Sequence, residues 1–351
     1  MRSVGIIANP AAGKDIRRLV AYGSSIDNHE KVNLVSRILL GLDAMGVELV
    51  HLMPDTFSIG LRALERLDGR ISLEPHLLEM EVEGTAQDSE LAASLMVREG
   101  VACIVTLGGD GTNRAVAKGC GRVPLIAISS GTNNIFPSFI EGTIAGMAAG
   151  VAASGMVPLP EYIVPHPRLL VRKGGMVVDM ALVDVVVTND LFPGTKAVWE
   201  VSHITEIFTC RARPDMVGLS AIPGCLHSLP QEPTGGLHLV LGEAGRGTKV
   251  LAPIAPGLIR PVWIAEWTQL QAGRKVRVSH YPSTLALDGE REIYAGGEES
   301  LEVELSFDGP FLLDHEGILR HAARMGLFER GVRAQGRHFD DRPRPRAPAL
   351  S

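Results

Sequence analysis

The sequence predicts an α/β protein in two parts: an N-terminal doubly wound parallel sheet and a mostly antiparallel, β-rich second domain. Strand-like and helix-like segments alternate over the first 155 residues or so, an order typical of a parallel sheet covered by helices. From about residue 158 the helical period fades, and short β-like runs separated by glycine and proline follow. With 351 residues, 45% of them hydrophobic, the chain is long enough for two hydrophobic cores.

The first domain begins with a buried strand at Ser3–Ala8, and an amphipathic helix follows it. That helix is predicted over Lys31–Met45, because apolar residues such as Val32 and Val35 recur at helical spacing. Thr85 is the predicted N-cap of a later helix. The further strands of this domain are predicted at Val47–Met53, His76–Val82, Val101–Leu107 and Pro124–Ile128, and the further helices at Ile59–Leu67 and Ala86–Arg98.

The second domain is predicted to consist of short antiparallel strands. Arg168–Arg172 and Met176–Thr188 flank Lys173-Gly174-Gly175, which is typical of a hairpin turn. Ile318–Phe328 is predicted to be a closing helix that packs on the first domain. Other strands are predicted at Met216–Ser220, Leu237–Leu241, Pro261–Glu266, Lys275–His280 and Leu301–Ser306. The predicted bounds are 1–157 for the first domain, 158–315 for the second, 316–330 for the closing helix and 331–351 for a tail whose composition is typical of disorder.

The charge balance of the chain argues against partners that bind through a large basic surface. With 34 basic and 40 acidic residues, its net charge of -6 argues against broad affinity for nucleic acid or a membrane surface. No apolar run approaches the ~20 residues that span a bilayer. The four cysteines show no CxxC pair, which suits a reducing compartment. We therefore expect a cytoplasmic protein that binds small molecules and has no nucleic-acid or membrane partner.

The most informative motif is Gly108-Gly109-Asp110-Gly111-Thr112, which directly follows a predicted strand. Its glycines allow main-chain N–H groups to approach a phosphate closely. A carboxylate in such a loop makes chemical sense if a metal ion bridges it to the phosphate, or if it accepts a proton from an attacking hydroxyl. The alternative interpretation is an ordinary Asp-Gly turn.

Two further turns follow strands of the same predicted sheet. Asn9-Pro10-x-x-Gly13-Lys14 follows the first strand, and Gly131-Thr132-Asn133-Asn134 follows the fifth. Because ligands bind beyond the carboxyl ends of parallel strands, the three turns are predicted to form one site. The first could supply amide donors and a cation to a phosphate, and the second two side-chain amides. Taken alone, the first is equally typical of a surface turn. The second is the stronger signal, and its alternative is a simple helix cap.

Other chemistries lack their sequence signals. The eleven histidines are scattered, and no HExxH motif or Cys/His pair has ligand spacing, so no protein-only metal site is predicted. The GxGxxG, GxxxxGK[ST] and GxSxG motifs are all absent. Asp288-Gly289-Glu290, taken alone, is typical of a simple hairpin turn between Thr284–Leu287 and Arg291–Tyr294.

These motifs together resemble the superfamily of NAD kinases, diacylglycerol kinases and sphingosine kinases. NAD kinases are the closer likeness, because Leu251–Pro261 resembles their TPICPxxxxxRP segment and Ala181–Val187 lies where they have ALNEVVV. Within this group the chain is most similar to the predicted ATP-NAD kinases of the acetoin-catabolism X type. Their opening, NPAAGKD followed by a basic segment, is similar to Asn9–Arg18. The likeness covers roughly residues 1–330.

The resemblance implies an NAD kinase-like fold and transfer of a phosphoryl group from ATP, with Mg²⁺, to a hydroxyl. In NAD kinases that hydroxyl is the 2′-hydroxyl of the adenosine ribose, so NAD(H) is the expected acceptor. By this resemblance Asp110 orients or deprotonates the hydroxyl, and Glu290 stands where the lipid kinases carry a catalytic Glu and NAD kinases read Gln. Members of the superfamily commonly form homo-oligomers, so we expect one here. The implied nucleotide- and phosphate-binding residues are Asn9, Gly13, Lys14, Gly108, Gly109, Gly111, Thr112, Gly131, Thr132, Asn133 and Asn134.

Two departures from the family pattern alter the acceptor site. The Asn-Glu pair that helps to bind NAD is Val183-Asp184 in this chain, and Ala221–His227 replaces a TPTGSTAY loop of which it keeps only Gly224. A lost hydrogen bond of this kind costs about 1–3 kcal/mol. The predicted acceptor-binding residues are Asp184, Gly224 and Asp288. A kinase of NAD(H) is thus the first hypothesis. The alternatives are a kinase for a lipid or small-metabolite hydroxyl, and a non-catalytic nucleotide-binding accessory or sensor protein linked to acetoin catabolism.

Overall fold

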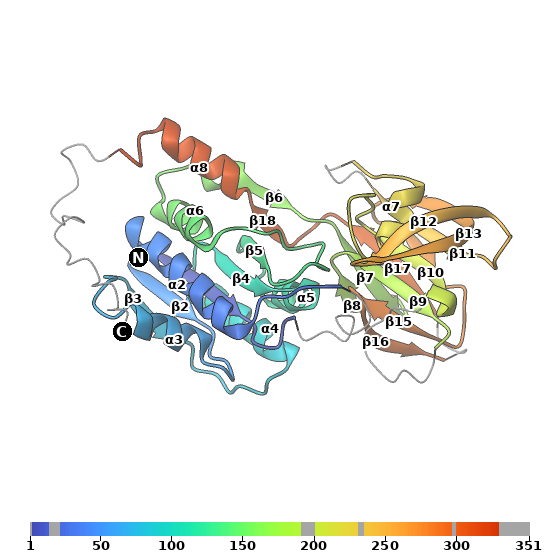
Figure 1. Ribbon diagram of the computed structural model, residues 1–351, viewed down its shortest axis with the longest axis horizontal. Coiled ribbons are helices and arrows are strands. Elements are labelled where there is room, and N and C mark those ends of the chain that lie inside the picture. Colours follow the sequence, from blue (N-terminus) through green and yellow to red (C-terminus); the bar gives the residue numbers. More distant parts are fainter. Residues whose placement is uncertain (1, 14–21, 191–200, 231–234, 297–299, 330–351) are drawn as a thin grey trace, which may run out of the picture.

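The protein has two lobes joined side by side, as a computed structural model shows (Figure 1). The structure describes residues 2–13, 22–190, 201–230, 235–296 and 300–329. The first lobe is built on a seven-stranded sheet of order β3-β2-β1-β4-β5-β18-β6. The second contains a seven-stranded sheet of order β12-β13-β11-β10-β9-β15-β16 and a four-stranded sheet of order β14-β17-β7-β8.

The sheet of the first lobe is parallel except at one edge. Parallel pairing runs from β3 to β18, and β6 is antiparallel to β18. Its strands are β1 (Ser3–Ala8), β2 (Leu49–Leu52), β3 (Glu74–Leu77), β4 (Ile104–Gly108), β5 (Leu125–Ser129), β6 (Ile163–Pro165) and β18 (Phe311–Leu313).

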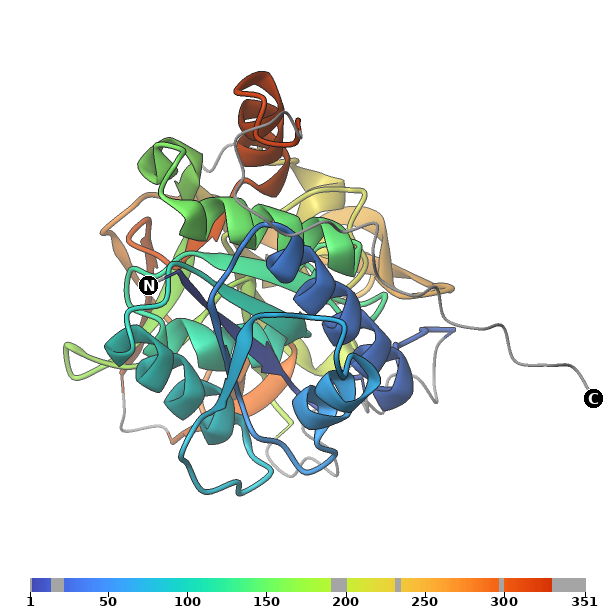
Figure 2. The same cartoon turned by 90° about the vertical axis from the view of Figure 1, so that its left-hand side faces the viewer.

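Helices cover both faces of this sheet (Figure 2), because neighbouring residues of each strand point to opposite faces. Ile6 packs in a cluster with α2, α3, α6 and α8, whereas Ile7 packs in a cluster with α4 and α5. This is the doubly wound arrangement that the sequence predicts. The helices are α2 (Asn28–Ala44), α3 (Ile59–Arg66), α4 (Ala86–Arg98), α5 (Asp110–Gly119), α6 (Gly142–Ser154) and α8 (His315–Arg324).

The second lobe is antiparallel throughout its described sheets. One cluster of buried side chains, including Val171, Phe208 and Val303, joins the two sheets, and another joins the larger sheet to α7 (Ala221–Leu226). The strands are β7 (Arg168–Lys173), β8 (Met176–Ala181), β9 (Asp184–Thr188), β10 (Ile204–Thr209), β11 (Gly236–Leu241), β12 (Thr248–Ala255), β13 (Leu258–Leu270), β14 (Lys275–Arg277), β15 (Ser283–Leu287), β16 (Glu290–Ala295) and β17 (Leu301–Ser306). Two 3₁₀ turns, at Leu159–Tyr162 and Val201–His203, precede β6 and β10.

The predicted fold class is confirmed, and several predicted elements are corrected. The strand predicted over Met176–Thr188 is two strands, β8 and β9, because the chain passes from one sheet to the other between them. Met216–Ser220 is not a strand but a series of turns leading into α7. The strand predicted at His76–Val82 is β3, which ends at Leu77, and the helices α5 and α6 were not predicted.

Two segments cross between the lobes. They are residues 166–167, after β6, and residues 307–310, before β18, and the His166 N–H donates to the Pro310 carbonyl oxygen at 2.7 Å. Both β6 and β18 belong to the sheet of the first lobe, although the predicted bounds assign them to the second domain. The closing helix α8 (His315–Arg324) buries Ile318 and Ala322 against the first lobe. The predicted tail at 331–351 lies outside the described residues. No helix in the part that the structure describes is long and apolar enough to cross a membrane.

Candidate active site

The three predicted turns meet at the carboxyl edge of the sheet in the first lobe. Residues 9–13 follow β1, Gly109 follows β4 and Gly131 follows β5 closely. Asn9 Nδ2 donates to Thr112 Oγ1 at 2.9 Å, which joins the first turn to the second. A Cβ added at Gly109 would lie 2.7 Å from Asn134 Oδ1, so the second and third turns are also in contact.

The Gly108–Thr112 segment is the start of a helix and not only a turn. Gly109 is the N-cap of α5, and Asp110 is the first residue of that helix. The first amide to bond within the helix is that of Asn113, which donates to the Gly109 carbonyl oxygen at 3.1 Å. The amides before it lie at the positive end of the helix dipole, an arrangement that favours an anion. Gly108 must be small, because a Cβ there would lie 2.5 Å from Thr112 Cβ.

The Asp110 carboxylate joins α5 to the loop after β5. Its Oδ1 accepts main-chain N–H bonds from Ile135 at 3.0 Å and Phe136 at 2.8 Å, and its Oδ2 accepts from Ile135 at 3.1 Å. These bonds fix the orientation of the carboxylate beside the helix N-terminus.

The loop after β5 uses its two asparagines differently. Asn134 Nδ2 donates to Ser129 Oγ at 2.9 Å and to the Gly131 carbonyl oxygen at 3.3 Å, and its oxygen faces Gly109. The Asn133 amide lies instead beside Gly23, whose added Cβ would be 3.4 Å from Asn133 Oδ1.

Residues 24 and 25, just before α2, contact the loop after β5 at the same edge of the sheet. Thr132 Oγ1 accepts the Ser24 N–H at 3.0 Å, and Gly131 pairs with Ser25. Gly13 (φ +87°) approaches Ser25, since a Cβ on it would lie 2.8 Å from Ser25 Cβ. Lys14, predicted to bind phosphate, lies outside the described residues.

The second lobe contributes the turn between β15 and β16. A Cβ added at Gly111 would lie 3.5 Å from Glu290 Oε1, so this exposed carboxylate is close to the start of α5. The neighbouring Asp288 is buried in a left-handed conformation (φ +52°). Its Oδ1 accepts N–H bonds from Leu182 at 3.0 Å and Val183 at 2.8 Å.

Burial and charge act together on Asp288. Burial is the largest effect and raises the pKa of Asp288. The nearby Arg114 lowers this pKa, whereas the Asp110 and Asp184 carboxylates raise it, and the result is a pKa of about 8. Arg114 Nε lies 3.7 Å from Asp288 Oδ2. Asp184 Oδ2 accepts from Ser220 Oγ at 2.6 Å. Three carboxylates thus lie near one another where the lobes meet, and Asp288 holds a proton more tightly than an ordinary aspartate.

Gly224 has a packing role. It lies in α7, and a Cβ on it would lie 2.4 Å from the Arg213 carbonyl oxygen. The predicted loop at Ala221–His227 is therefore a short helix that needs a glycine for its close contact with the preceding segment. Val183, at the position of the family Asn, is buried among apolar side chains.

Comparisons with known proteins place the chain in a family. Residues 4–155 match the ATP-NAD kinase N-terminal domain, and residues 167–308 match the acetoin catabolism protein X C-terminal domain. The acetoin catabolism protein X of Cupriavidus necator is 39% identical over 335 residues, which cover 93% of each chain. The chain belongs to the acetoin catabolism protein X family. The family resemblance seen in the motifs is thereby confirmed.

Two solved structures align with most of this chain at low sequence identity. Yeast NADH kinase complexed with NADH is 14% identical, with a TM-score of 0.48 over 96% of this chain and 90% of that one. A diacylglycerol kinase from Bacillus anthracis strain Sterne is 13% identical, with a TM-score of 0.45 over 89% of this chain and 96% of that one.

Sequence reasoning missed several charged residues that the fold brings to this site. Lys31 is fully buried, and its Nζ donates to the carbonyl oxygens of Asn9 at 2.9 Å and Ala12 at 2.8 Å. One signal was present in the sequence, because Lys31 lies on the apolar face of α2 together with Val35 and Ile38. Arg114 and Arg211 gave no comparable signal.

The side chains present are compatible with magnesium that arrives with a nucleotide. Within the described ranges, no group of three or more His, Cys, Asp or Glu side chains could hold a metal ion. Mg²⁺ is commonly held by one or two carboxylates together with substrate phosphates, so a protein-only cage is not required. Asp110, the first residue of α5, and Glu290, which lies beside Gly111, are the carboxylates that fit this pattern.

Proposed function

We propose that this protein transfers a phosphoryl group from ATP to a hydroxyl. The observation that carries the proposal is that Glu290, from the second lobe, lies beside Gly111, the residue that follows Asp110 at the N-terminus of α5. Phosphoryl transfer depends mainly on positioning and charge stabilisation. A helix N-terminus for the phosphates and a fixed carboxylate beside it are suited to both tasks.

The phosphate-binding part of the proposal uses the first lobe. The amides at the start of α5, the turn at residues 9–13 and the Asn134 side chain would hold the nucleotide phosphates. Bound Mg²⁺, held by the phosphates and by Asp110 or Glu290, supplies charge neutralisation. Lys14, Thr132 and Asn133 remain predicted nucleotide contacts.

Asp110 is proposed to orient the attacking hydroxyl and to accept its proton. Its two main-chain partners, Ile135 and Phe136, hold the carboxylate in one orientation before any substrate binds. This reduces the reorganisation that the transition state requires. Glu290, in the second lobe, is proposed to be the other catalytic carboxylate of this site.

The acceptor is proposed to bind between the lobes, beside Asp184 and Asp288, and the first candidate is the 2′-hydroxyl of NAD(H). The match of residues 4–155 to the ATP-NAD kinase N-terminal domain favours it. The second candidate is the hydroxyl of a lipid or small metabolite, favoured by the position of Glu290 near Gly111. The buried Val183 supports the third, a nucleotide-binding accessory or sensor protein. A homo-oligomer, as expected from the resemblance, is tested by light scattering after size exclusion.

The test combines an acceptor panel with one substitution. The protein is incubated with Mg·ATP and NAD, NADH, acetoin or diacylglycerol, and ADP is measured by mass spectrometry. Asp110→Asn keeps an oxygen that can accept the Ile135 and Phe136 N–H bonds but removes the proton acceptor. We expect ADP formation to fall at least 100-fold, while ATP still raises the melting temperature.

The matched control is Asp68→Asn, at an exposed position after α3, which should leave ADP formation unchanged. Unchanged turnover in Asp110→Asn would contradict the assigned role. If ATP stabilises the wild-type protein but no acceptor yields ADP, the accessory or sensor hypothesis is supported instead.

A further inference from the structure

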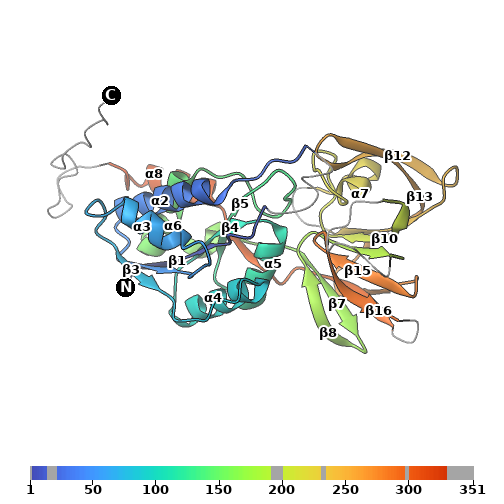
Figure 3. The ribbon, with the colours of Figure 1, turned by 60° about the horizontal axis from the view of Figure 1, so that its bottom comes forward.

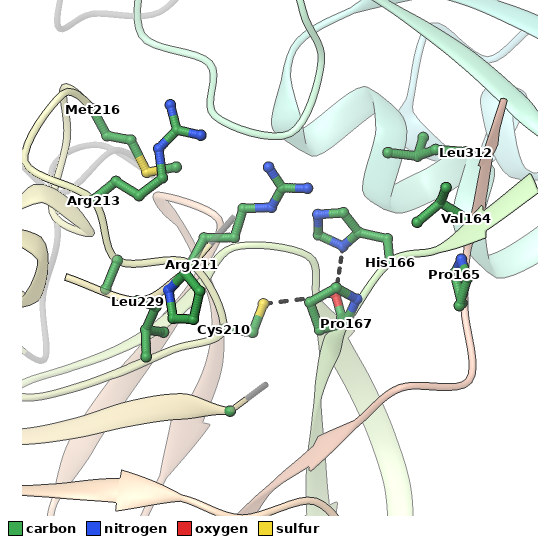
Figure 4. Close-up of a pocket in the computed structure, with 13 residues that line it drawn as sticks. Val164, Pro165, His166, Pro167, Cys210, Arg211, Arg213, Met216, Leu229 and Leu312 are labelled. Carbon is green, nitrogen blue, oxygen red and sulfur yellow. Dashed lines mark hydrogen bonds between the residues drawn. The ribbon is translucent and has the colours of Figure 1, made fainter. Parts of the chain in front are cut away.

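A small pocket lies at the junction of the two lobes (Figure 4). His166 and Pro167, in the segment that crosses after β6, line one side, and Arg211 and Arg213, after β10, line another. Its volume is about 80 Å³, roughly half that of an apolar cavity of ~150 Å³ that binds one benzene molecule. The pocket therefore suits one small polar group and not a whole nucleotide.

Arg211 is the cation of this pocket. Its guanidinium makes no hydrogen bond or ion pair with any residue that the structure describes, although burial is strong enough to lower its pKa. A charge taken from water without a partner is unfavourable, and an anion bound beside it would compensate. Figure 4 shows the guanidinium and the His166 ring directed into the same space.

His166 supplies a hydrogen-bond acceptor. Its Nδ1 lies 2.5 Å from the Pro167 carbonyl oxygen, so Nδ1 carries the proton and donates it there. Burial, and then the charge of Arg211, keep the pKa of this imidazole well below its ordinary value of 6.5. The neutral ring therefore has a lone pair on Nε2, which is buried and has no hydrogen-bond partner among the described residues. Only 2% of the residue surface is exposed.

Arg213 does not compete for the same role. Its guanidinium already forms a bidentate pair with Asp215, with Nε–Oδ1 at 2.8 Å and Nη2–Oδ2 at 2.5 Å. Of the two arginines that line the pocket, Arg213 is paired with a carboxylate, whereas Arg211 has no such pair among the described residues.

The pocket adjoins the candidate active site. The His166 ring packs edge-on against Phe136, at a centroid distance of 4.6 Å, and the Phe136 N–H holds the Asp110 carboxylate. Arg211 and Asp110 also interact electrostatically. A molecule anchored in this pocket would therefore lie near the proposed phosphoryl-transfer site.

We propose that Arg211 and His166 form a subsite for a hydroxylated oxyanion, which anchors the acceptor molecule. Arg211 binds the phosphate or carboxylate oxygens, and His166 Nε2 accepts a hydrogen bond from an adjacent hydroxyl. As the anchor of an acceptor, the subsite rests on the proposed kinase function. The group could belong to the phosphate and ribose of a dinucleotide or to a free hydroxy acid or phosphate, and these sources share the same chemistry.

Binding to the subsite is measured by calorimetry, without ATP, on the full chain. The probes are sodium phosphate, sodium lactate, sodium propionate and NAD, each against sodium chloride at equal ionic strength. We expect phosphate and lactate to bind, and propionate, which lacks the hydroxyl, to bind at least fivefold more weakly than lactate. Competition of NAD with phosphate identifies a dinucleotide as the source, whereas simultaneous binding of both identifies a free small anion.

Three variants assign the binding. Arg211→Met should weaken phosphate and lactate binding at least tenfold, and it should not lower the melting temperature in anion-free buffer, because the guanidinium makes no hydrogen bond or ion pair with a described residue that would be lost. His166→Asn keeps a donor for the Pro167 oxygen but lacks Nε2, so the preference for lactate over propionate should disappear. The matched control, Arg246→Met, alters an arginine whose side chain is 82% exposed in the turn between β11 and β12, and it should bind like the wild type.

The outcomes separate the subsite from the kinase function. The subsite is overturned if phosphate and lactate bind no better than chloride, or if Arg211→Met binds them as Arg246→Met does. The wild-type comparison of lactate, propionate and chloride decides the first point even if a variant fails to fold. If anion binding depends on Arg211 but no acceptor yields ADP, the subsite is supported and the proposed kinase function is contradicted. If Arg211→Met forms ADP with an unchanged KM for the acceptor, the kinase function is supported, and the role of the subsite in anchoring the acceptor is contradicted.

Discussion

At the scale of single residues, Lys31 shows how a buried charge can shape a binding turn. Its ammonium is enclosed behind residues 9–13 and donates to the Asn9 and Ala12 carbonyl oxygens and, at 3.1 Å, to Asn28 Oδ1. A buried ammonium is stable only when its donors are used, and these three oxygens use them. The residue therefore fixes the turn and adds positive charge beside a proposed phosphate site.

Replacing this ammonium tests both effects. Lys31→Met keeps most of the side-chain volume but leaves the Asn9 and Ala12 oxygens without that donor, a loss of about 1–3 kcal/mol. We expect Mg·ATP to bind at least tenfold more weakly by calorimetry, with a lower melting temperature. Lys275→Met, exposed in the second lobe, is the control and should bind ATP normally. Equal ATP affinity in the two variants would show that Lys31 has only a structural role.

The residues of the site were predictable where they follow strands. Asp110 and Asn134 stand at the ends of apolar runs, so their convergence follows from the rule for parallel sheets. Lys31, Arg114 and Arg211 could not be placed in this way, because their neighbours come from segments far away in the sequence. The motifs also gave no sign that Gly224 packs against a backbone instead of facing a ligand.

At the scale of secondary-structure elements, Glu206 joins three segments of the second lobe. It lies on β10, its side chain is fully buried, and its Oε2 is 2.9 Å from His238 Nε2 on β11. Its Oε1 accepts the Ser279 N–H at 2.8 Å, after β14, and lies 3.1 Å from His280 Nδ1. Burial raises the pKa of Glu206, but the hydrogen bonds from His238, Ser279 and His280 outweigh it and lower the pKa from 4.5 to about 2.

The lowered pKa predicts a pH-dependent contribution to stability. A carboxylate with a pKa of about 2 in the folded state and 4.5 in the unfolded state stabilises the fold above about pH 4.5. That contribution, on the order of 3 kcal/mol, is lost as the pH falls from 4.5 towards 2. In urea unfolding, Glu206→Gln should therefore be less stable than the wild type at pH 7, and the difference should shrink between pH 5 and pH 3.

The control for this prediction is Glu243→Gln, whose side chain is 83% exposed before β12. It should change stability by less than about 0.5 kcal/mol at every pH. A gap between wild type and Glu206→Gln that stays constant down to pH 3 would contradict the role of the carboxylate charge.

Helices and strands were predicted correctly where a single hydrophobic periodicity runs through the segment. They were predicted wrongly where contacts with distant parts of the chain determine the local structure. β1 and α4 were predicted with their observed bounds, because each is an unbroken pattern next to a turn or a cap. The run at Met176–Thr188 is continuously β-like, so the sequence does not show that the chain changes sheets at Leu182. α5 was missed because its first turn is rich in glycine, which local propensity disfavours in a helix.

At the scale of the whole molecule, the proposed site exists only if the lobes keep their relative position. Arg114, on α5 of the first lobe, lies 3.3 Å from Asp179 on β8 and 3.7 Å from the buried Asp288. Lys118, one turn further along α5, pairs with Asp179 at 2.8 Å. In Figure 3, α5 is the helix of the first lobe that lies beside the second. These contacts join the helix proposed to bind phosphate to β8 and to Asp288, which lies two residues before Glu290.

The two cations should contribute unequally, because they differ in burial. Arg114→Met removes a buried cation from Asp179 and from beside the largely protonated Asp288, which should destabilise the protein by about 1–3 kcal/mol and speed hydrogen exchange in α5 and β8. Lys118→Met, at a side chain 32% exposed, should cost less than about 1 kcal/mol. If the lobes must be held together for phosphoryl transfer, ADP formation should fall in the first variant and persist in the second. Equal losses of stability and equal exchange in both variants would show that the buried pair does not fix the lobes.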